Sequence, residues 1–498
     1  MIASRWDFFE SDETAFMNAE EQVEDTPAIR QSTGILEEQR GSFRVVLRNR
    51  PFLFLWLAQL LSQIVFNAAN YGVIVVVTQV TGSTVMVGFA IISFTLPAVP
   101  FSLLAGVYVD YLDKRLVLWT CNALRAIATA LIVVALIWNP HTVIPLYFLA
   151  FLISLITQFF TPAEASSIPM LVGRKELVPA LSLFNITLTI AQAIGFLLLG
   201  RIIEAIFPPF HISLGFTSVL VQSIDMLFVV VAVSYVVCAL LILAIPARAW
   251  KHELAVKHEQ SLSPGRSMWK IVRHDVGESW QIIRGDHSLF VALLDVSYIS
   301  ILLLVVGELA GPYVQNVLHL PVANISLIFA PAGIGLVLGG LVMPRLTRLL
   351  GKSRTISLGS VCTAAALILL PLGRFVIVHV SFFVPWLLFF VGAMAFILGM
   401  ALDMVNIPAQ TVMQEHTPED VRGRVFAFQS TLYNAGSIPV ILFAGVIADT
   451  LGIETVMYVL AAAVLLFQLW TRFYNRQPKR TPIGTPPYSR DVAEPRYP

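Results

Sequence analysis

The segment Gly106-Val-Tyr-Val-Asp110-Tyr-Leu-Asp113-Lys114-Arg115 separates two long apolar stretches of the chain. It brings a small residue, an acidic residue and a basic pair close together. Gly106 and Asp110 share one helical face if the preceding stretch continues this far as a helix, because residues four apart are neighbours on a helix surface. Charges are costly within a bilayer, so we expect this segment at the water boundary between two membrane-spanning helices.

The composition of the whole chain supports this interpretation. Hydrophobic residues make up 57% of the 498 residues and charged residues 13%, with a mean hydropathy of +0.78, whereas about 25% of residues in an ordinary soluble protein are charged. A net charge of +1 argues against a nucleic-acid-binding surface. Cys121, Cys238 and Cys362 lie far apart and have no metal-ligand or disulfide spacing. We therefore expect a membrane protein that is not an enzyme, holds no metal or cofactor and binds no nucleic acid.

Apolar stretches long enough to cross a bilayer, which takes about 20 residues, recur along the chain. Twelve are found, near residues 51–78, 84–108, 115–138, 143–163, 178–203, 222–245, 288–314, 322–344, 355–374, 381–407, 424–448 and 453–474. They predict an all-α integral membrane protein with two six-helix halves, at 49–245 and 287–475. A polar linker at 246–286 separates the halves, and polar tails occupy 1–48, which we expect to be disordered, and 476–498.

Basic residues in the connections predict the orientation. Alternate connections, on the side of the tails, carry seventeen Lys and Arg residues, whereas the opposite connections carry Arg201 and Arg374. Because basic loops stay in the cytoplasm, we expect both termini at the cytoplasmic face of a plasma membrane. In the linker, apolar positions from Trp269 to Ile283 follow a helical period, which predicts an amphipathic helix on that face. It could join two moving halves as a strap or be a surface linker anchored by tryptophans.

A short pattern, glycine followed four residues later by an acid, recurs along the chain. Gly106 and Asp110 are followed by three further copies, which are Gly200/Glu204, Gly445/Asp449 and a degenerate Gly340/Pro344. The copies fall at the ends of the second, fifth, eleventh and eighth apolar stretches. This placement predicts that each half contains two three-helix units of inverted topology.

The opening segment resembles the loop between the second and third helices of the major facilitator superfamily, which has the form Gly-x-Leu-x-Asp-Arg-x-Gly-Arg-Arg/Lys. Four positions match, namely Gly106, Asp110, Lys114 and Arg115, and three depart, namely Tyr108, Tyr111 and Asp113. The resemblance implies a secondary active transporter that works by rocking of its two halves. It also implies a small-molecule substrate, a lipid bilayer as surroundings and a monomeric state.

A second motif, Pro418-Glu-Asp-Val-Arg422-Gly423-Arg424-Val425, is similar to a signature of the exporter branch that includes siderophore and macrolide efflux proteins. Thr81-Gly82-Ser83 and Leu124-Arg125-Ala126 also resemble that branch. The resemblance implies efflux of a small amphipathic or hydrophobic molecule by a proton-driven antiporter. The fourth stretch lacks the Arg of some proton antiporters, so proton coupling rests on the resemblance alone. A non-transporting sensor or scaffold, an importer and a lipid flippase remain alternatives.

The two motifs supply the candidate gating residues, which are Gly106, Asp110, Lys114, Arg115, Arg422, Gly423 and Arg424. Asp110 could pair with Lys114, Arg115 or Arg424 and so hold the cytoplasmic ends of the halves together. The alternative is that the basic pair serves only to orient the protein in the membrane.

Ionisable residues within the apolar stretches are candidates for proton coupling or substrate binding, because burying them in lipid costs a few kcal/mol. They are Asp295, which we expect about 10 Å deep at 1.5 Å per residue, Glu308, Asp403 near the cytoplasmic end of its helix, and Arg125. Static pairing with other groups is the competing interpretation.

Polar residues form one stripe in each half. The first contains Gln63, Asn67, Asn70 and Tyr71, and the second contains Asp403, Asn406 and Gln410. Such stripes usually face the interior of a bundle, so they are candidates for lining a central cavity, with interhelical hydrogen bonding as the alternative. Gly333, Gly335 and Gly339 predict close helix packing.

Overall fold

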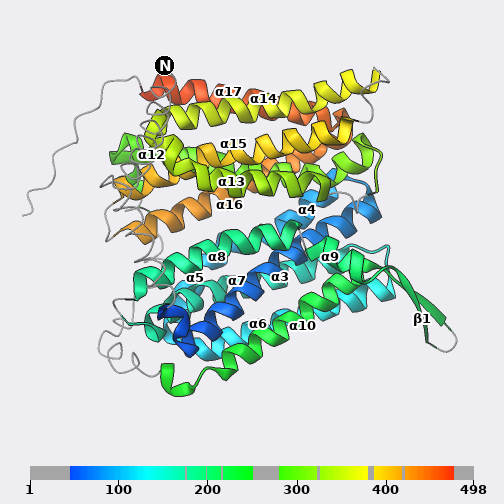
Figure 1. The fold of residues 1–498 in the computed structure, drawn as a ribbon, viewed down its shortest axis with the longest axis vertical. Coiled ribbons are helices and arrows are strands. Elements are labelled where there is room, and N and C mark those ends of the chain that lie inside the picture. The colour runs from blue at the N-terminus through cyan, green and yellow to red at the C-terminus, as the bar shows by residue number, and fades with distance from the viewer. Residues whose placement is uncertain are drawn as a thin grey trace, which may run out of the picture.

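A computed structural model describes residues 45–173, 176–197, 199–214, 217–250, 277, 280–321, 326–379, 386–417 and 421–475. Nearly all of the predicted tails and most of the linker, including Trp269, lie outside these residues. The helices run side by side in two bundles, which are stacked in Figure 1.

The first bundle is built by the N-terminal half. Its helices are α3 (Arg50–Thr81), α4 (Thr84–Thr95), α5 (Ala98–Tyr111), α6 (Lys114–Trp138), α7 (Ile144–Leu171), α8 (Leu177–Leu197), α9 (Leu199–Ile206) and α10 (Ser223–Ala244). An antiparallel hairpin of β1 (Phe210–Leu214) and β2 (Thr217–Val221) joins α9 to α10, with Phe210 opposite Val221. This hairpin is a small exception to the all-α architecture.

The second bundle follows the short 3-10 turn Ala247–Trp250 and the linker. It contains α12 (His287–Pro312), which continues as a π-helical turn over Tyr313–Val317, and five further helices. These are α13 (Ser326–Leu350), α14 (Lys352–His379), α15 (Leu387–His416), α16 (Arg422–Leu451) and α17 (Ile453–Asn475). We call the end of the bundles where α3 begins and α17 ends the terminal end, and the opposite end the distal end.

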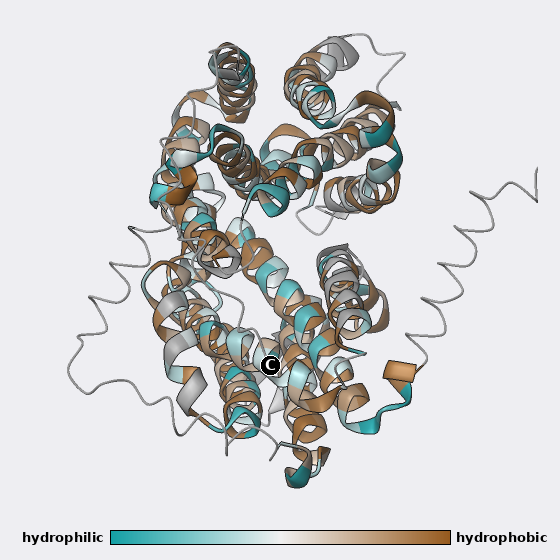
Figure 2. Ribbon diagram, turned by 90° about the vertical axis from the view of Figure 1, so that its left-hand side faces the viewer, coloured by the Kyte–Doolittle hydropathy of each residue, from teal (hydrophilic) through white to brown (hydrophobic). Residues whose placement is uncertain are grey.

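The predicted membrane-spanning architecture is confirmed. Eleven of the described helical segments are long and apolar enough to cross a bilayer, and α8, 21 residues long, packs beside α3 and α13. Helices suit this solvent because they satisfy every backbone N–H and C=O group internally. Figure 2 views the helices nearly end on and shows hydrophobic residues on helices of both bundles.

Three predicted boundaries need correction. The second span is broken at Leu96 and Pro97 into α4 and α5, and the fourth extends beyond residue 163 to Leu171. The tenth span ends at His416 rather than at residue 407, because Pro408 lies within α15 without ending it. Asp403 is therefore thirteen residues from the end of its helix, or about 20 Å at 1.5 Å per residue, and lies deeper than expected.

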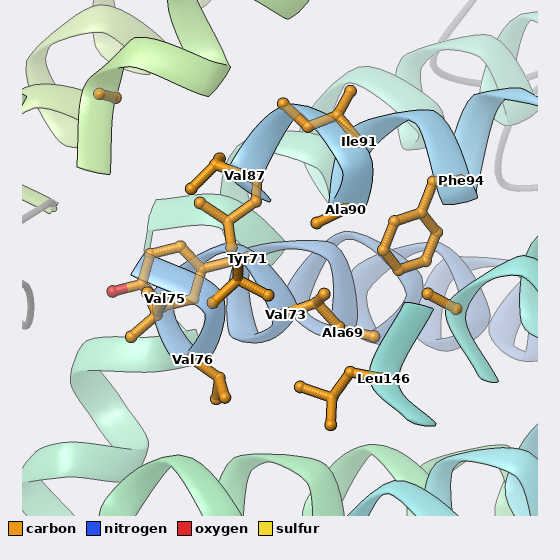
Figure 3. Close-up of a cluster of buried hydrophobic side chains, with 14 of the residues drawn as sticks. Ala69, Tyr71, Val73, Val75, Val76, Val87, Ala90, Ile91, Phe94 and Leu146 are labelled. Carbon is orange, nitrogen blue, oxygen red and sulfur yellow. The ribbon is translucent and has the colours of Figure 1, made fainter. Parts of the chain in front are cut away.

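Small residues bring the helices close together. Figure 3 shows side chains of α3, α4 and α7, such as Val73, Ala90 and Leu146, meeting in one buried cluster. Between α13 and α15, a methyl group on Gly335 would lie 2.2 Å from the Phe396 carbonyl oxygen. Such an approach is possible only without a side chain, so the predicted role of this glycine in helix packing is confirmed.

The last residues of the linker pack on the second bundle. Ile283 is fully buried among residues of α12, α15 and α16, and the Trp280 ring lies 5.8 Å from that of Phe428. The guanidinium carbon of Arg284 lies 4.7 Å from the Trp280 ring centre. This part of the linker is thus attached to the C-terminal half.

Candidate functional site

The two halves are joined at the distal end by an acidic residue of one half and a helix N-terminus of the other. Asp449, near the end of α16, accepts hydrogen bonds from Ser83 Oγ at 2.5 Å, the Thr84 N–H at 2.7 Å and the Val85 N–H at 3.2 Å. The first N–H groups of a helix have no partner within the helix and carry partial positive charge. Asp449 therefore caps α4 from the opposite half, and we call this set of four residues the distal clasp.

The clasp joins the two halves directly. Its three hydrogen bonds run from α4 and the residue before it to the end of α16. A cavity of about 430 Å³ opens beside it, with Gly82, Asn316 and Glu454 among the lining residues. The described contacts thus hold the halves together at the distal end.

Glu308 of α12 lies about one helical turn from the clasp, beside Gly445 of α16. Its side chain is fully buried, and neither carboxyl oxygen has a hydrogen-bond partner among the described residues. A methyl group on Gly88 of α4 would lie 2.6 Å from Glu308 Oε1, and one on Gly445 of α16 would lie 2.9 Å from the same atom. The acid is therefore enclosed between helices of both halves.

The recurring glycine pattern has a structural counterpart at three of its four positions. Gly445 touches Glu308, Gly340 lies beside Asp403, and a methyl group on Gly200 would lie 2.6 Å from the Tyr71 ring. Gly106 differs, because a methyl group there would meet nothing within 4 Å. Each of the three copies thus provides space for a predicted site residue.

The basic residues of the opening segment bind backbone carbonyl groups. Lys114 Nζ donates to the Val109 oxygen at 2.7 Å and to the Leu112 oxygen at 3.1 Å. Arg115 Nη2 donates to the Leu243 oxygen, at the end of α10, at 2.6 Å. These contacts stay within the N-terminal half. The side chains of Asp110, Arg422 and Arg424 and the surroundings of Gly423 lie outside the description, so the predicted pairing across the halves stays a prediction.

Two further acids lie deep in the second bundle. Asp295, eight residues after the start of α12, is 3% exposed, and its Oδ1 has no partner among the described residues. Asp403 packs against α13, where a methyl group on Gly339 would lie 3.2 Å from its Oδ2. Each acid is placed within a span as predicted, with Asp403 deeper than expected.

Arg125 belongs to a buried polar cluster of the first bundle. It is 1% exposed, and its Nη1 donates to Ser62 Oγ at 3.0 Å. Its guanidinium carbon lies 4.3 Å from the Phe160 ring centre and 5.7 Å from that of Tyr235. Cation–π contacts of this kind stabilise a desolvated guanidinium group.

Glu164 of α7 belongs to the same cluster and was missed in the sequence analysis. It is 6% exposed, and Arg125 is the cation that acts on it. Its Oε1 has no hydrogen-bond partner within the described structure. The miss follows from the predicted helix boundary at residue 163, which placed Glu164 at the water boundary instead of inside a helix.

The two polar stripes lie in different halves and bond largely to their own helices. Asn67 donates to the Gln63 carbonyl at 2.8 Å and Asn70 to that of Phe66 at 3.0 Å. Tyr71 is 5% exposed and packs against Gly200. In the second stripe, Gln410 Nε2 donates to Asn406 Oδ1 at 3.0 Å. Apart from Tyr71, these stripe residues are partly exposed.

One ionic contact at the terminal end lies at the start of α12. Asp286 caps this helix by accepting from the Ser288 and Leu289 N–H groups and lies 2.7 Å from His416 Nδ1. Partial burial raises the pKa of the Asp286 carboxyl group, but the hydrogen bonds from His416, Leu289 and Ser288 outweigh it, so that the pKa lies below its ordinary value. Lys352 and Glu415 form a second ion pair nearby.

Comparison with protein families decides the assignment of the fold. The family model described as Major Facilitator Superfamily matches residues 55–440 and 393–495. The chain belongs to the Major Facilitator Superfamily. It is therefore a multi-pass membrane transporter with a small-molecule substrate, which confirms the superfamily resemblance of the opening segment. The similarity to the exporter branch remains a prediction.

Individual relatives of this superfamily member are distant. An uncharacterized MFS-type transporter of Bacillus subtilis, YfiS, is 22% identical over 397 residues, which cover 79% of this chain and 85% of that protein. The crystal structure of the nucleoside transporter NupG matches with a TM-score of 0.61 at 14% identity, covering 86% of this chain and 100% of NupG. An inward-facing bacterial homologue of the iron transporter ferroportin matches with a TM-score of 0.62 at 16% identity, covering 86% and 99% of the two chains. The two solved structures share the fold.

Proposed function

We propose that the protein exports a small amphipathic or hydrophobic molecule across the plasma membrane by proton-driven alternating access, with both termini in the cytoplasm. The observation that carries this proposal is the capping of α4 by Asp449 from the opposite half. A contact at one end of two bundles is what a transporter needs if its halves rock about a central site.

The chemistry of the clasp suits a gate that opens. Its three hydrogen bonds join polar groups near the surface. Water can replace such bonds, and a hydrogen bond to a charged group contributes only about 1.5–3 kcal/mol net. The contact is therefore weak enough to break during transport.

The opposite gate follows from the inverted repeats. Asp449 near the end of α16 caps α4, and Asp110 near the end of α5 has the corresponding place relative to the start of α16. In the alternate state, Asp110 would cap α16 near Arg422 and Arg424 and close the terminal end.

The substrate class is inferred from the two polar stripes and from the apolar spans around them. The stripes around Asn67 and Asn406 provide hydrogen-bonding groups, and the surrounding spans provide apolar surface. Asp295 and Asp403 would favour a substrate with a cationic group, or would exchange protons once water reaches them. An amphipathic molecule satisfies both kinds of surface.

Transport into inside-out vesicles tests the proposal. The full-length protein would be supplied with a panel of siderophores, macrolides and lysolipids, with and without a pH gradient. We expect accumulation of at least one compound that stops when a protonophore collapses the gradient, and none in vesicles without the protein. Movement in the opposite direction would identify an importer, and the absence of movement for every compound would favour a sensor or scaffold.

A further inference from the structure

Glu308 differs from the other acids of the spans in being enclosed by both halves at the distal end. We propose that Glu308 is the proton-binding residue of the distal gate. In this proposal α4 and α16 close over Glu308 only when its carboxyl group has bound a proton from the distal solution, and the deprotonated carboxylate favours the open gate. The inference rests on the proposed alternating access and specifies the step that the proton controls.

The surroundings of Glu308 favour the neutral acid. Glu308 lies beside the backbone at Gly88 of the opposite half and at Gly445 of its own half, and Ile441 Cγ2 would lie 3.0 Å from a methyl group on Gly88. The structure provides no hydrogen-bond donor or cation to either carboxyl oxygen among the described residues. A buried carboxylate needs such partners, because its hydration is lost without replacement. A carboxylic acid carries no net charge and avoids most of this cost.

Neighbouring charges act in the same direction. Asp449, one turn beyond Gly445, is the charged group that acts on Glu308, and it is negative. α4 carries no titratable side chain between Thr84 and Thr95. The remainder of α16 and the other helices packed against α12 also carry titratable groups. Among the described residues, none of these groups acts on Glu308. They include Tyr71, Asp403, Tyr433, Glu454 and Tyr458. No described cation therefore compensates a negative charge at this position.

Opening of the gate changes this environment directly. Separation of α4 from α16 removes the Gly88 backbone from Glu308 and admits water, which hydrates the carboxylate. Closure then requires a proton from the distal solution to bind a carboxyl oxygen. The clasp does not need this proton, because Asp449 keeps its charge and is bonded by Ser83 and Thr84. The two acids thus have separate roles, with Asp449 as the cap and Glu308 as the proton acceptor.

Distance measurements between the halves test the proposal without any substrate. Spin labels would be placed at Trp138, the exposed distal end of α6, and at Leu451, the exposed end of α16. The labels would be attached through cysteines in full-length protein whose three native cysteines are replaced by serine, reconstituted in lipid nanodiscs. We expect raising the pH to increase the ratio of distal-open to distal-closed protein by up to about tenfold per pH unit, the limit for one proton.

Variants assign this response to Glu308. In Glu308→Gln, which is close in shape but cannot ionise, we expect the short distance at every pH. Asp225→Asn is the control, because this acid also lies at the distal end but accepts a hydrogen bond from the Gln222 N–H within the cap of α10, and it should keep the wild-type response. If Glu308→Gln does not fold, as judged by size-exclusion chromatography, Glu308→Leu replaces it as a second uncharged variant.

Two outcomes would overturn the inference. One is a wild-type distance that does not change with pH, and the other is an uncharged variant that responds as the wild type does. Because this readout requires no transport, a failure here is distinguishable from a failure of the vesicle assay.

Discussion

Ser83 Oγ donates a hydrogen bond to Asp449 Oδ2 at 2.5 Å, although the two residues are 366 positions apart and belong to different halves of the transporter. The adjacent Thr84 N–H donates to the other carboxyl oxygen of Asp449. The C-terminal half thus completes a helix cap in the N-terminal half, and substitutions at this cap test the distal gate directly.

Removing the cap should favour the distal-open state. Asp449→Ala takes away the acceptor of the Thr84 N–H, and loss of such a cap costs about 1 kcal/mol, or roughly a fivefold change in an equilibrium. We expect this roughly fivefold increase in the ratio of open to closed protein, measured from the distance between spin labels at Trp138 and Leu451. Thr450→Ala is the control, because among the described residues this hydroxyl bonds only to the Val446 carbonyl of its own helix. Equal effects of the two substitutions would show that the cap does not hold the gate.

Filling the space beside Glu308 should destabilise the closed distal gate. In Gly88→Ala the new methyl group would lie 2.6 Å from Glu308 Oε1 and 3.0 Å from Ile441 Cγ2. The Glu308 carboxyl group can shift, so we expect the low end of the cost of overpacking, about 1 kcal/mol. We expect a lower unfolding temperature and a shift to longer distances across the gate. Gly436→Ala on α16 is the control, because its methyl group would make an ordinary 3.4 Å contact with Ile301. A gate distance unaffected by Gly88→Ala would contradict the described packing.

Arg125 and Glu164 should depend on one another. Arg125→Met leaves Glu164 buried without the cation that acts on it, so we expect a large drop in unfolding temperature. Glu164→Gln in the same chain should recover part of this loss, with an interaction energy of about 0.5–3 kcal/mol. A double-mutant cycle of thermal unfolding in detergent measures it, and strictly additive effects would show that the two residues are independent.

Acid should weaken the contact at the start of α12. The folded-state pKa of Asp286 is lowered from 3.8, so its contribution to stability is present above that ordinary value and is lost as the pH falls through the lower folded-state pKa. We expect the unfolding temperature to fall in this acidic range. Asp286→Asn can still cap the helix but cannot titrate, so it should lose this part of the pH dependence. An unchanged acid profile in this variant would remove Asp286 as its cause.

Asp295 is tested by transport itself. If Asp295 takes part in proton coupling, Asp295→Asn should abolish the dependence of substrate accumulation on the pH gradient in inside-out vesicles. Uptake down a substrate gradient should continue, because the gate residues are intact. Proton dependence equal to that of the wild type would exclude Asp295 from the coupling step.

The placement of Asp403 and Glu164 shows where sequence reasoning is limited. The depth of each residue was predicted from where its helix was expected to end. Both helices continue further, to His416 and Leu171. Pro408 and Pro162 lie inside these helices, where neighbouring helices compensate for the lost backbone hydrogen bonds. A helix end therefore depends on tertiary contacts that local composition does not reveal.

The sequence by itself determined the membrane class, the approximate spans and the superfamily, because a bilayer admits only long apolar helices and the charged loops between them are easily recognised. It also indicated Glu308 and Asp449 as separate features, one an acid within a span and the other a copy of the pattern at Gly106. Only the tertiary structure decided that Asp449 caps α4 and that Glu308 lies between Gly88 and Gly445. Those relationships depend on how two separately built bundles pack, and packing joins residues whose distance in the chain carries no information about their contact.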